Sequence, residues 1–145
     1  MLNRQYCASA YTIDYENKKV LLMYNKKLNK WLQPGGHIEG NELPAETAIR
    51  ETLEETGIKI EIVGPTYDNK VYQPIAVENY KNKIGDMIDI QFLAIPITKQ
   101  LENSEKNETR WFGFKEMLES DEIEDEIKNK VIKLYETFLK NRNNF

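Results

Sequence analysis

Short apolar runs and longer periodic segments divide this chain into expected strands and helices. β-Branched, aromatic and small residues predict strands over Tyr6–Ile13 and Val20–Tyr24, and the polar turn between these two runs predicts a hairpin. Ile58–Val63 alternates apolar with charged residues, as a half-buried strand does. Thr109–Phe112 is expected to form a further short strand, and Tyr67–Ile75 another.

Met87–Ile97 is expected to be the longest strand, with two faces that differ in polarity. One face carries Ile88, Ile90, Phe92 and Ala94, and the other carries Asp89 and Gln91. The polar stretches on either side, Glu78–Gly85 and Lys99–Asn107, are expected to be loops. A proline followed by two glycines, at positions 34–36, predicts a turn at which the backbone can approach a ligand closely.

Two segments repeat apolar residues with the period of a helix. The first is expected to begin near Pro44, which suits the first helical position, and to end at Gly57, which suits the position after the last. Its expected inward stripe is Ala45, Ala48, Ile49, Thr52 and Leu53. The second is expected to pack on the body through Ile123, Ile127, Val131, Tyr135, Phe138 and Leu139. Its expected solvated face carries Lys128, Lys130, Lys133 and Lys140.

The order of these elements, with one further helical turn at Lys115–Leu118, predicts an α/β fold with helices on both faces of a sheet. A chain of 145 residues, 40% of them apolar, is large enough for one well-packed core. Because the sequence contains no internal repeat, linker or low-complexity tract, residues 1–145 are expected to form a single domain.

The charge and the apolar runs exclude several kinds of partner. A net charge of −4 and a sequence pI of about 5.2 argue against a broad basic surface for polymeric nucleic acid or anionic lipid. The N-terminus lacks the apolar core of a signal peptide, and Phe92–Ile97 is too short to span a bilayer. Cys7 is the only cysteine, so no intramolecular disulfide can form. We therefore expect a cytoplasmic protein without a membrane partner.

Missing residue types and motifs exclude several kinds of catalytic site. His37 is the only histidine, which rules out a zinc site built from several histidines and a Ser-His-Asp triad built on any other imidazole. The chain has no Cys-x-x-Cys, no Gly-x-Gly-x-x-Gly and no Walker loop. Carboxylate chemistry is what remains.

Three glutamates of the first helix, Glu51, Glu54 and Glu55, stand at positions i, i+3 and i+4 and converge within one turn. Like charges at these spacings destabilise a helix by about 0.2–0.5 kcal/mol per pair unless a cation lies between them. Oxygen ligands of this kind suit Mg²⁺ or Mn²⁺. The alternative is a solvated acidic face with Arg50 and Lys59 as its counterions.

The wider spacing around these glutamates resembles the Nudix box, G-x5-E-x7-R-E-U-x-E-E-x-G-U, in which U is an aliphatic residue. The match runs from Gly36 through Glu42 to residues 50–58, Arg-Glu-Thr-Leu-Glu-Glu-Thr-Gly-Ile. Thr52 departs from the motif, because an aliphatic residue is expected there, and should make a slightly weaker core contact. Leu43 occupies the position before the helix where Ser or Thr often stands, and its side chain cannot cap the helix.

This resemblance implies a Nudix-type α/β/α sandwich with a mixed sheet, and a MutT-like hydrolase that uses Mg²⁺ or Mn²⁺ to cleave a nucleoside diphosphate linked to another moiety. By position in the motif, Glu51, Glu54 and Glu55 are the implied metal ligands, with the Gly35 carbonyl as a further one. Glu54 could instead be the base that takes a proton from the attacking water.

The resemblance also assigns roles to two charged residues that flank the loop. Arg50 resembles the residue that forms a salt bridge with Glu42 and thereby orients the loop of the motif on its helix. We therefore count Arg50 with Glu51 and Glu54 among the candidate catalytic residues.

Candidate substrate-binding residues lie outside the fixed positions of the motif. Glu108 resembles an acidic ligand or base that many Nudix enzymes take from a loop after the long strand, and Glu102 and Glu105 compete for that role; a surface acid is the alternative. Asp89 either faces the catalytic cleft or marks an exposed part of the sheet. His37, beside the glycine turn, could contact phosphate, act as an acid, or be an exposed loop residue.

Aromatic side chains are the natural partners for stacking on a base. The candidates are Trp31, Tyr24, Tyr72 and Tyr80, each of which is otherwise a core or rim residue. ADP-ribose-cleaving relatives often carry a proline past the motif, as Pro74 stands past Ile58, but a nucleoside triphosphate suits the chain equally well.

Two hypotheses compete with the hypothesis of an enzyme that acts on a small nucleotide. A Nudix-like module could bind a nucleotide for regulation without turning it over, or the acidic helix face could hold no metal at all. A homodimer is compatible with every one of these readings.

Overall fold

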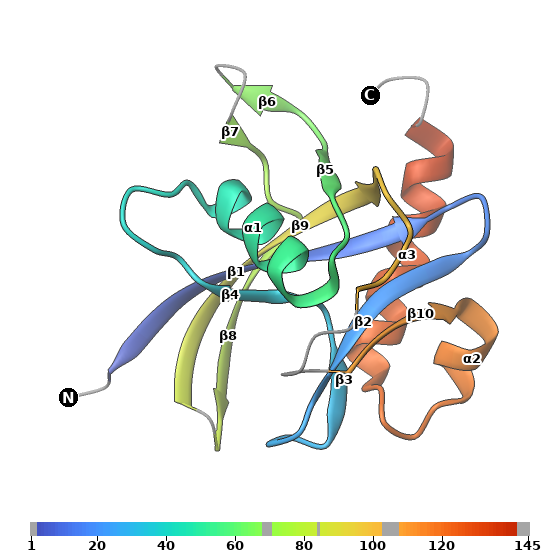
Figure 1. Cartoon of the computed structure of the whole chain (residues 1–145), viewed down its shortest axis with the longest axis horizontal. Coiled ribbons are helices and arrows are strands. Elements are labelled where there is room, and N and C mark those ends of the chain that lie inside the picture. Colours follow the sequence, from blue (N-terminus) through green and yellow to red (C-terminus); the bar gives the residue numbers. More distant parts are fainter. Residues whose placement is uncertain (1–2, 68–70, 84, 103–107, 142–145) are drawn as a thin grey trace.

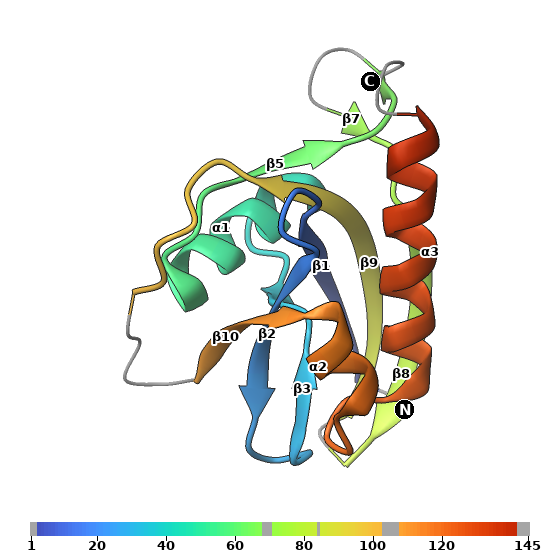
Figure 2. The same ribbon diagram turned by 90° about the vertical axis from the view of Figure 1, so that its right-hand side faces the viewer.

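The computed structural model describes residues 3–67, 71–83, 85–102 and 108–141. At its centre lies a mixed sheet whose main path runs in the order β10-β2-β1-β9-β5. These strands are β1 (Arg4–Asp14), β2 (Lys19–Asn25), β5 (Ile60–Val63), β9 (Gly85–Pro96) and β10 (Thr109–Gly113) (Figure 1). Helix α1 (Pro44–Thr56) covers one face and α3 (Asp125–Asn141) the other, as Figure 2 shows. The α/β/α sandwich around a mixed sheet is confirmed.

Shorter elements extend this framework. Strand β3 (Lys30–Leu32) pairs with β2, β4 (Gly35–His37) with β1, and β8 (Ala76–Asn82) with β9. The two-residue strands β6 (Thr66–Tyr67) and β7 (Val71–Tyr72) pair with each other, and α2 (Phe114–Glu119) follows β10. Within the part of the chain that the structure describes, no helix is both long and apolar enough to cross a membrane.

Strand β1 changes its neighbour along its length, which splits one side of the sheet. Cys7, Ala8 and Ser9 pair with β4, whereas Ile13 and Asp14 pair with β2. On its other edge β1 runs parallel to β9. In Figure 1 the branch formed by β2 and β3 diverges from the branch formed by β8 and β9, and we call this divergence the fork.

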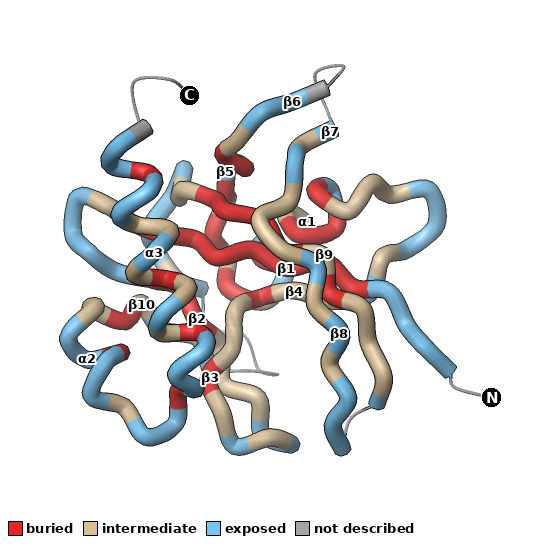
Figure 3. Tube along the Cα trace, turned by 180° about the vertical axis from the view of Figure 1, so that it is seen from behind, coloured by how far each residue is buried: buried red, intermediate tan, exposed pale blue. Residues whose placement is uncertain are grey.

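Alternation along β1 supplies both layers of the core. Ala8 and Ala10 belong to the apolar cluster that packs under α1, and their small size lets that helix lie close to the sheet. Tyr11 and Ile13 point the opposite way, into the cluster that packs under α3. In Figure 3 the buried part of the trace follows β1 through the middle of the molecule.

Helix α1 begins and ends where the sequence predicts. Pro44 is its first residue, and Gly57 adopts a left-handed conformation (φ 78°) from which its N–H donates to the Leu53 carbonyl at 2.8 Å. Leu43 makes no side-chain cap; instead the Glu46 carboxylate accepts a 2.9 Å hydrogen bond from the Leu43 N–H. A carboxylate in the first turn also complements the helix dipole.

The inward stripe of α1 differs from the prediction at three positions, because Leu53 is exposed and Thr47 and Thr56 are buried. Leu53 was expected to face the core but is 41% exposed, whereas Thr47 is fully buried and donates a 3.0 Å hydrogen bond to Glu42. The buried stripe is centred on Ala45, Ala48 and Thr52, whose small side chains let the helix sit low on the sheet and leave Leu53 on the flank. The Thr52 hydroxyl is buried without a hydrogen-bond partner, a costlier departure than a slightly weaker core contact.

Three expectations about connecting segments are wrong. Residues predicted as the loop Glu78–Gly85 lie largely in β8, an edge strand whose polar side chains face either solvent or a cleft, so the sequence shows no apolar alternation. Gly35 and Gly36 lie in β4 rather than in a turn. The single strand expected over Tyr67–Ile75 is instead the pair β6 and β7. In the predicted loop Lys99–Asn107, residues 99–102 are irregular, and residues 103–107 lie outside the described residues.

The C-terminal helix packs as predicted through Ile127, Val131 and Phe138, although Leu139 is exposed. Two of its lysines, however, are not solvated. Lys130 forms an ion pair with Glu78 and also donates to Gln91 at 2.9 Å, because α3 lies across the β8–β9 branch. Lys128 donates to the carbonyls of Leu118 and Ser120, at 3.1 and 2.7 Å, where α2 ends.

Candidate active site

The Arg50 side chain links the loop before α1 to the acidic face of that helix. Its guanidinium makes two hydrogen bonds to Glu42, Nε to Oε2 at 2.6 Å and Nη2 to Oε1 at 3.0 Å, and Nη2 also donates to the His37 carbonyl at 3.2 Å. Nη1 donates to Glu51 at 3.0 Å and to Glu54 at 3.2 Å. The hydrogen bonds from Arg50 hold the pKa of Glu42 at about 2. The salt bridge that the motif implies is present, and it fixes the loop on the helix.

Glu51 and Glu55 form a carboxyl pair one helical turn apart. Burial, followed by the hydrogen bond and charge of Glu51, raises the pKa of Glu55 well above its usual range, while the Gly35 N–H lowers it in part. One oxygen of Glu55, Oε2, is buried and receives no hydrogen bond from the protein. Two facing carboxyl groups with an unpaired buried oxygen form an acceptor site that a cation would satisfy.

Neighbouring groups lie so close to β4 on both sides that only glycine fits at positions 35 and 36. A Cβ atom on Gly36 would lie 2.4 Å from Cδ of Glu51, and a Cβ on Gly35 would lie 2.5 Å from Cβ of Ser9 and 2.6 Å from the carbonyl oxygen of Ala8. The group that approaches Gly36 in this structure is the Glu51 carboxylate, and the close approach of a ligand to this backbone stays a prediction. The absence of a side chain on Gly36 brings β4 directly against α1.

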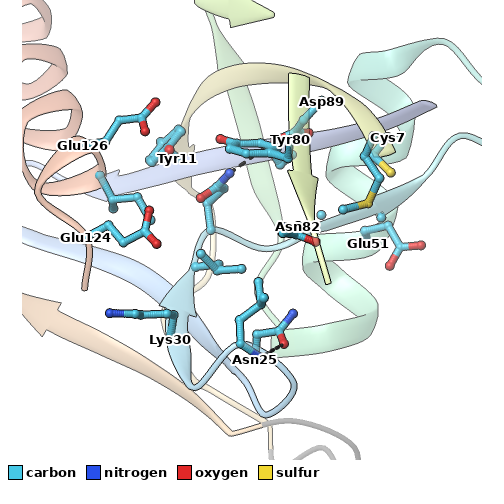
Figure 4. A pocket seen from close by; sticks show the side chains of 18 of the residues that line it. Cys7, Tyr11, Asn25, Lys30, Glu51, Tyr80, Asn82, Asp89, Glu124 and Glu126 are labelled. Carbon is cyan, nitrogen blue, oxygen red and sulfur yellow. Dashed lines mark hydrogen bonds between the residues drawn. The ribbon is translucent and has the colours of Figure 1, made fainter. Parts of the chain in front are cut away.

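A cleft of about 640 Å³ opens in the fork, beside these glutamates. Asn25, Lys30 and Leu32 line it from the β2–β3 branch, and Tyr80, Met87 and Asp89 from the β8–β9 branch. Figure 4 shows that it extends from Glu51 past Cys7 and Tyr80 to Glu124 and Glu126, at the beginning of α3. The carboxyl pair therefore lies at one end of a cavity large enough for a nucleotide-sized molecule.

A hydrogen-bonded network of polar side chains forms the wall of the cleft on the β8–β9 branch. Gln91 donates from Nε2 to Asp89 Oδ2 at 3.1 Å and to the Tyr80 hydroxyl at 2.8 Å, and the same hydroxyl donates to Glu78. Lys130 closes the network through Glu78 and Gln91. Burial raises the pKa of Asp89, against the hydrogen bonds that its Oδ2 accepts. The network ties α3 to the floor of the cleft.

The structure gathers some of the expected site residues and separates others. Glu51, Glu55, Gly35, His37 and Asp89 all line the cleft, whereas Glu54 points outward with a side chain that is 58% exposed. Among the described residues, no three carboxylate, imidazole or thiolate groups converge on one point, because the Arg50 guanidinium lies between Glu51 and Glu54.

Trp31 and Glu108 lie outside the residues that line the cleft. Trp31 is 7% exposed and packs edge-on against Tyr24 and Phe112 in the core. Glu108 is exposed at the start of β10, where its carbonyl accepts from the Tyr24 N–H at 2.8 Å.

The remaining candidates fall in three places. Glu102 packs against Gly57 at the end of α1, and Glu105 lies outside the described residues. Tyr72 is partly buried against the core under α1. Of the four aromatic candidates, Tyr80 lines the cleft.

Ser9, Gln33 and Gln91 were not identified from the sequence as residues of this site. Ser9 and Gln91 are almost fully buried, and each interrupts an otherwise apolar strand, which is the signal that could have found them. Gln33 precedes the Pro-Gly-Gly stretch, and nothing in the local pattern marks it.

The loop and helix that carry these carboxylates belong to a domain recognised across the chain: residues 4–135 match the family described as NUDIX domain. The chain belongs to this family. Nudix hydrolases use divalent metal ions, and the carboxyl pair with its unpaired oxygen fits such an ion. They act on small nucleotide-linked substrates, for which the cleft is large enough.

Relatives of this NUDIX domain differ in name and length. A probable DHNTP pyrophosphohydrolase of Lactococcus lactis is 28% identical over 121 residues, covering 82% of this chain and 57% of that protein. A CMP-5'-(N-acetyl-N-hydroxy-3-aminopropyl)phosphonate hydrolase of Streptomyces rubellomurinus is 31% identical over 119 residues, covering 77% of this chain and 53% of that protein. The chain thus spans little more than half the length of these curated relatives.

Solved structures confirm the fold of this NUDIX domain. A NUDIX-family hydrolase from Clostridium perfringens superposes with a TM-score of 0.81 at 25% identity, covering 94% of this chain and 99% of that one. A UDP-X diphosphatase superposes with a TM-score of 0.67 at 17% identity, covering 94% of this chain and 64% of that one, which shows a shared fold alone.

Proposed function

We propose that this protein hydrolyses the pyrophosphate linkage of a nucleoside diphosphate joined to another moiety, and that it needs a divalent metal ion, Mg²⁺ or Mn²⁺, to do so. The observation that carries the proposal is the Glu51–Glu55 carboxyl pair, with its unpaired buried oxygen, at the end of a nucleotide-sized cleft. The uninterrupted glutamate pattern of the box favours turnover over a binding module without chemistry.

Glu51 and Glu55 are the proposed metal ligands, joined by the Gly35 carbonyl, and of the two roles that the motif offers Glu54 we assign it the base rather than a ligand. The metal supplies neutralising charge for the diphosphate and lowers the pKa of the attacking water. Arg50 keeps Glu51 oriented through the 3.0 Å hydrogen bond and anchors the loop to the helix through Glu42. A carboxylate fixed in this way loses little conformational freedom when it binds a cation.

Glu54 is the proposed base that takes the proton from the attacking water. Its side chain is 58% exposed, against 16% for Glu51, and its ion pair with Arg50 is a single 3.2 Å contact. An exposed carboxylate held by one contact can turn toward a water molecule at little cost.

A substrate panel tests this function directly. The panel contains nucleoside triphosphates, nucleotide sugars and dinucleoside polyphosphates with Mg²⁺ or Mn²⁺, since the relatives carry names with different substrates. We expect metal-dependent turnover of at least one member, with cleavage between two phosphorus atoms seen by ³¹P NMR. Tight binding of nucleotides without turnover of any member would favour the binding or regulatory module instead.

The two glycines of β4 give a matched pair of substitutions. In Gly36→Ala the new methyl group meets the Glu51 carboxylate, the movable end of a side chain, so we expect Glu51 to shift and kcat to fall by about 10²-fold with little change in stability. In Gly35→Ala the methyl group meets the backbone of β1, so we expect a loss of about 1–3 kcal/mol in the free energy of unfolding. Steady-state kinetics and thermal unfolding of both variants check this contrast; equal effects of the two on stability would contradict it.

A further inference from the structure

Lys130, on α3, makes its contacts with the sheet rather than with solvent. Its side chain is 17% exposed, and its ammonium group forms an ion pair with Glu78 and donates to Gln91 Oε1 at 2.9 Å. The same ammonium group lies 5.3 Å from the centre of the Tyr11 ring, over its face. One lysine therefore joins α3 to side chains from three strands, β8, β9 and β1.

The Gln91 side chain is fully buried, so a wrong orientation of its amide group would leave polar atoms mismatched away from water. Its Oε1 accepts from Lys130, while its Nε2 donates to Asp89 Oδ2 at 3.1 Å and to the Tyr80 hydroxyl at 2.8 Å. The opposite orientation would set the amide NH₂ against the ammonium group, and a lysine ammonium has no acceptor. Lys130 thus selects one of the two orientations of this amide.

Tyr80 and Glu78 close a ring of hydrogen bonds with Gln91 and Lys130. The Tyr80 hydroxyl accepts from Gln91 and donates to Glu78, whose other oxygen accepts from Lys130. Burial and the Glu78 carboxylate raise the pKa of Tyr80, so its hydroxyl keeps the proton that it donates. For Glu78, burial is outweighed by the hydrogen bonds from Lys130 and Tyr80, which lower the pKa of its carboxyl group and keep it an acceptor. Each hydrogen bond of the ring therefore has one direction.

The Gln91 amide donates to two side chains that line the cleft. These are Tyr80 and Asp89, whereas Lys130 and Gln91 lie outside the cleft lining. In Figure 4 Tyr80 lies beside Tyr11 on one wall of the cleft. Strand β8, which carries Tyr80, is an edge strand whose partner in the described sheet is β9 alone. Contacts with α3 thus add a restraint that a second neighbouring strand would otherwise supply, and Lys130 exerts this restraint on the cleft through other side chains.

We propose that Lys130 is a positioning residue for substrate binding: by fixing the Gln91 amide it holds Tyr80 and the β8 wall of the cleft in the arrangement that receives the substrate. This inference rests on the proposed function and adds a residue of α3 to it. The proposed metal ligands lie on α1 and β4, whereas Lys130 contacts β1, β8 and β9. Loss of Lys130 should therefore weaken binding and leave the chemical step almost unchanged.

Lys130→Met removes the ammonium group and keeps an unbranched, flexible side chain. With the panel member that the wild-type protein hydrolyses fastest, we expect KM to rise about 5- to 20-fold while kcat stays within about threefold of the wild type, as when ground-state binding is lost. Lys133→Met, which changes an exposed lysine of the same helix, is the matched control and should keep both values. A kcat that falls as far as kcat/KM, with KM unchanged, would overturn the inference.

A double-mutant cycle tests whether Lys130 acts through Gln91. Gln91→Met removes the amide that the lysine orients and should raise KM to a similar extent. Because the two residues act as one unit, the double variant Lys130→Met/Gln91→Met should show a KM within about twofold of the higher single variant. Effects on KM that multiply would show that the lysine acts independently of the amide, and would overturn the inference. Thermal unfolding checks that each variant is folded, and Lys130→Gln, with a shorter neutral side chain, replaces Lys130→Met if that variant does not fold.

NMR of the protein without nucleotide tests the same point independently of turnover. The side-chain NH₂ signals of Gln91, identified by their loss in Gln91→Met, should be protected from exchange with water in the wild type and in Lys133→Met. They should lose this protection in Lys130→Met. Unchanged signals in Lys130→Met would overturn the inference even if KM rises. If no member of the panel is hydrolysed, the proposed function fails, and these signals still decide whether Lys130 orders the wall of the cleft.

Discussion

Replacing Glu54 with glutamine is expected to lower kcat by about 10²- to 10⁴-fold, the contribution typical of a positioned general base. The fold should survive, because the Glu54 side chain is exposed and its ion pair with Arg50 is a single contact that solvent screens. Glutamine keeps the size of the side chain but does not take up a proton at neutral pH. Steady-state kinetics at saturating substrate measure the loss, and circular dichroism with thermal unfolding confirms that the protein is folded.

Glu46→Gln is the matched control for this substitution. Glu46 lies in the first turn of the same helix, and a glutamine there retains an oxygen that can accept the hydrogen bond from the Leu43 N–H. Its activity should equal that of the wild type within about threefold. Near wild-type activity of Glu54→Gln would remove Glu54 from the mechanism and leave the proton to another acceptor.

Removal of divalent metal is expected to abolish turnover, by at least about 10³-fold, because the carboxylates of α1 offer no positive charge to a diphosphate. Dialysis against EDTA followed by addition of Mg²⁺ or Mn²⁺ should remove and then restore activity. Calorimetry with Mn²⁺ should detect binding to the wild type and its loss in the double variant Glu51→Gln/Glu55→Gln, which keeps the shape of both side chains.

Lys133→Ala provides a control for non-specific effects of metal and chelator, since this residue lies on α3, outside the lining of the cleft. It should bind Mn²⁺ as the wild type does. Turnover that continues at the wild-type rate in EDTA, or unchanged Mn²⁺ binding by the double variant, would contradict the proposed metal site.

Local sequence patterns predicted the parts of this fold whose side chains face one clear environment. The start of α1 at Pro44, its end at Gly57 and the two faces of β9 all follow from rules that operate within a few residues. Strand β8 escaped prediction because Val77 faces outward while Glu78 and Tyr80 face a polar network with Gln91 and Lys130. An edge strand with solvent on one face and polar side chains on the other has the amino-acid composition of a loop.

The candidate site was predictable only where it lies within one continuous motif. Spacing alone brings Glu51 and Glu55 together, because one helical turn separates them. The network around Asp89 joins Ser9, Gln33 and Lys130, which come from separate parts of the chain, and no local pattern shows that they meet. Trp31 could not be assigned from the sequence for a different reason. An aromatic residue near the motif can either stack on a base or pack in the core, and only the structure shows that Trp31 packs in the core.

The fork in the sheet keeps the carboxylates of α1 structurally separate from the two strand branches that form most of the cleft. The loop and helix from Gly36 to Ile58 are held together by their own contacts, above all those of Arg50. The two branches that diverge from β1 carry the opposite walls of the cleft and end in exposed hairpin tips. Substitutions in those branches can therefore reshape the pocket while the proposed metal site keeps its geometry. Under the proposed function, the preferred substrate can change during evolution while the residues proposed for hydrolysis are retained.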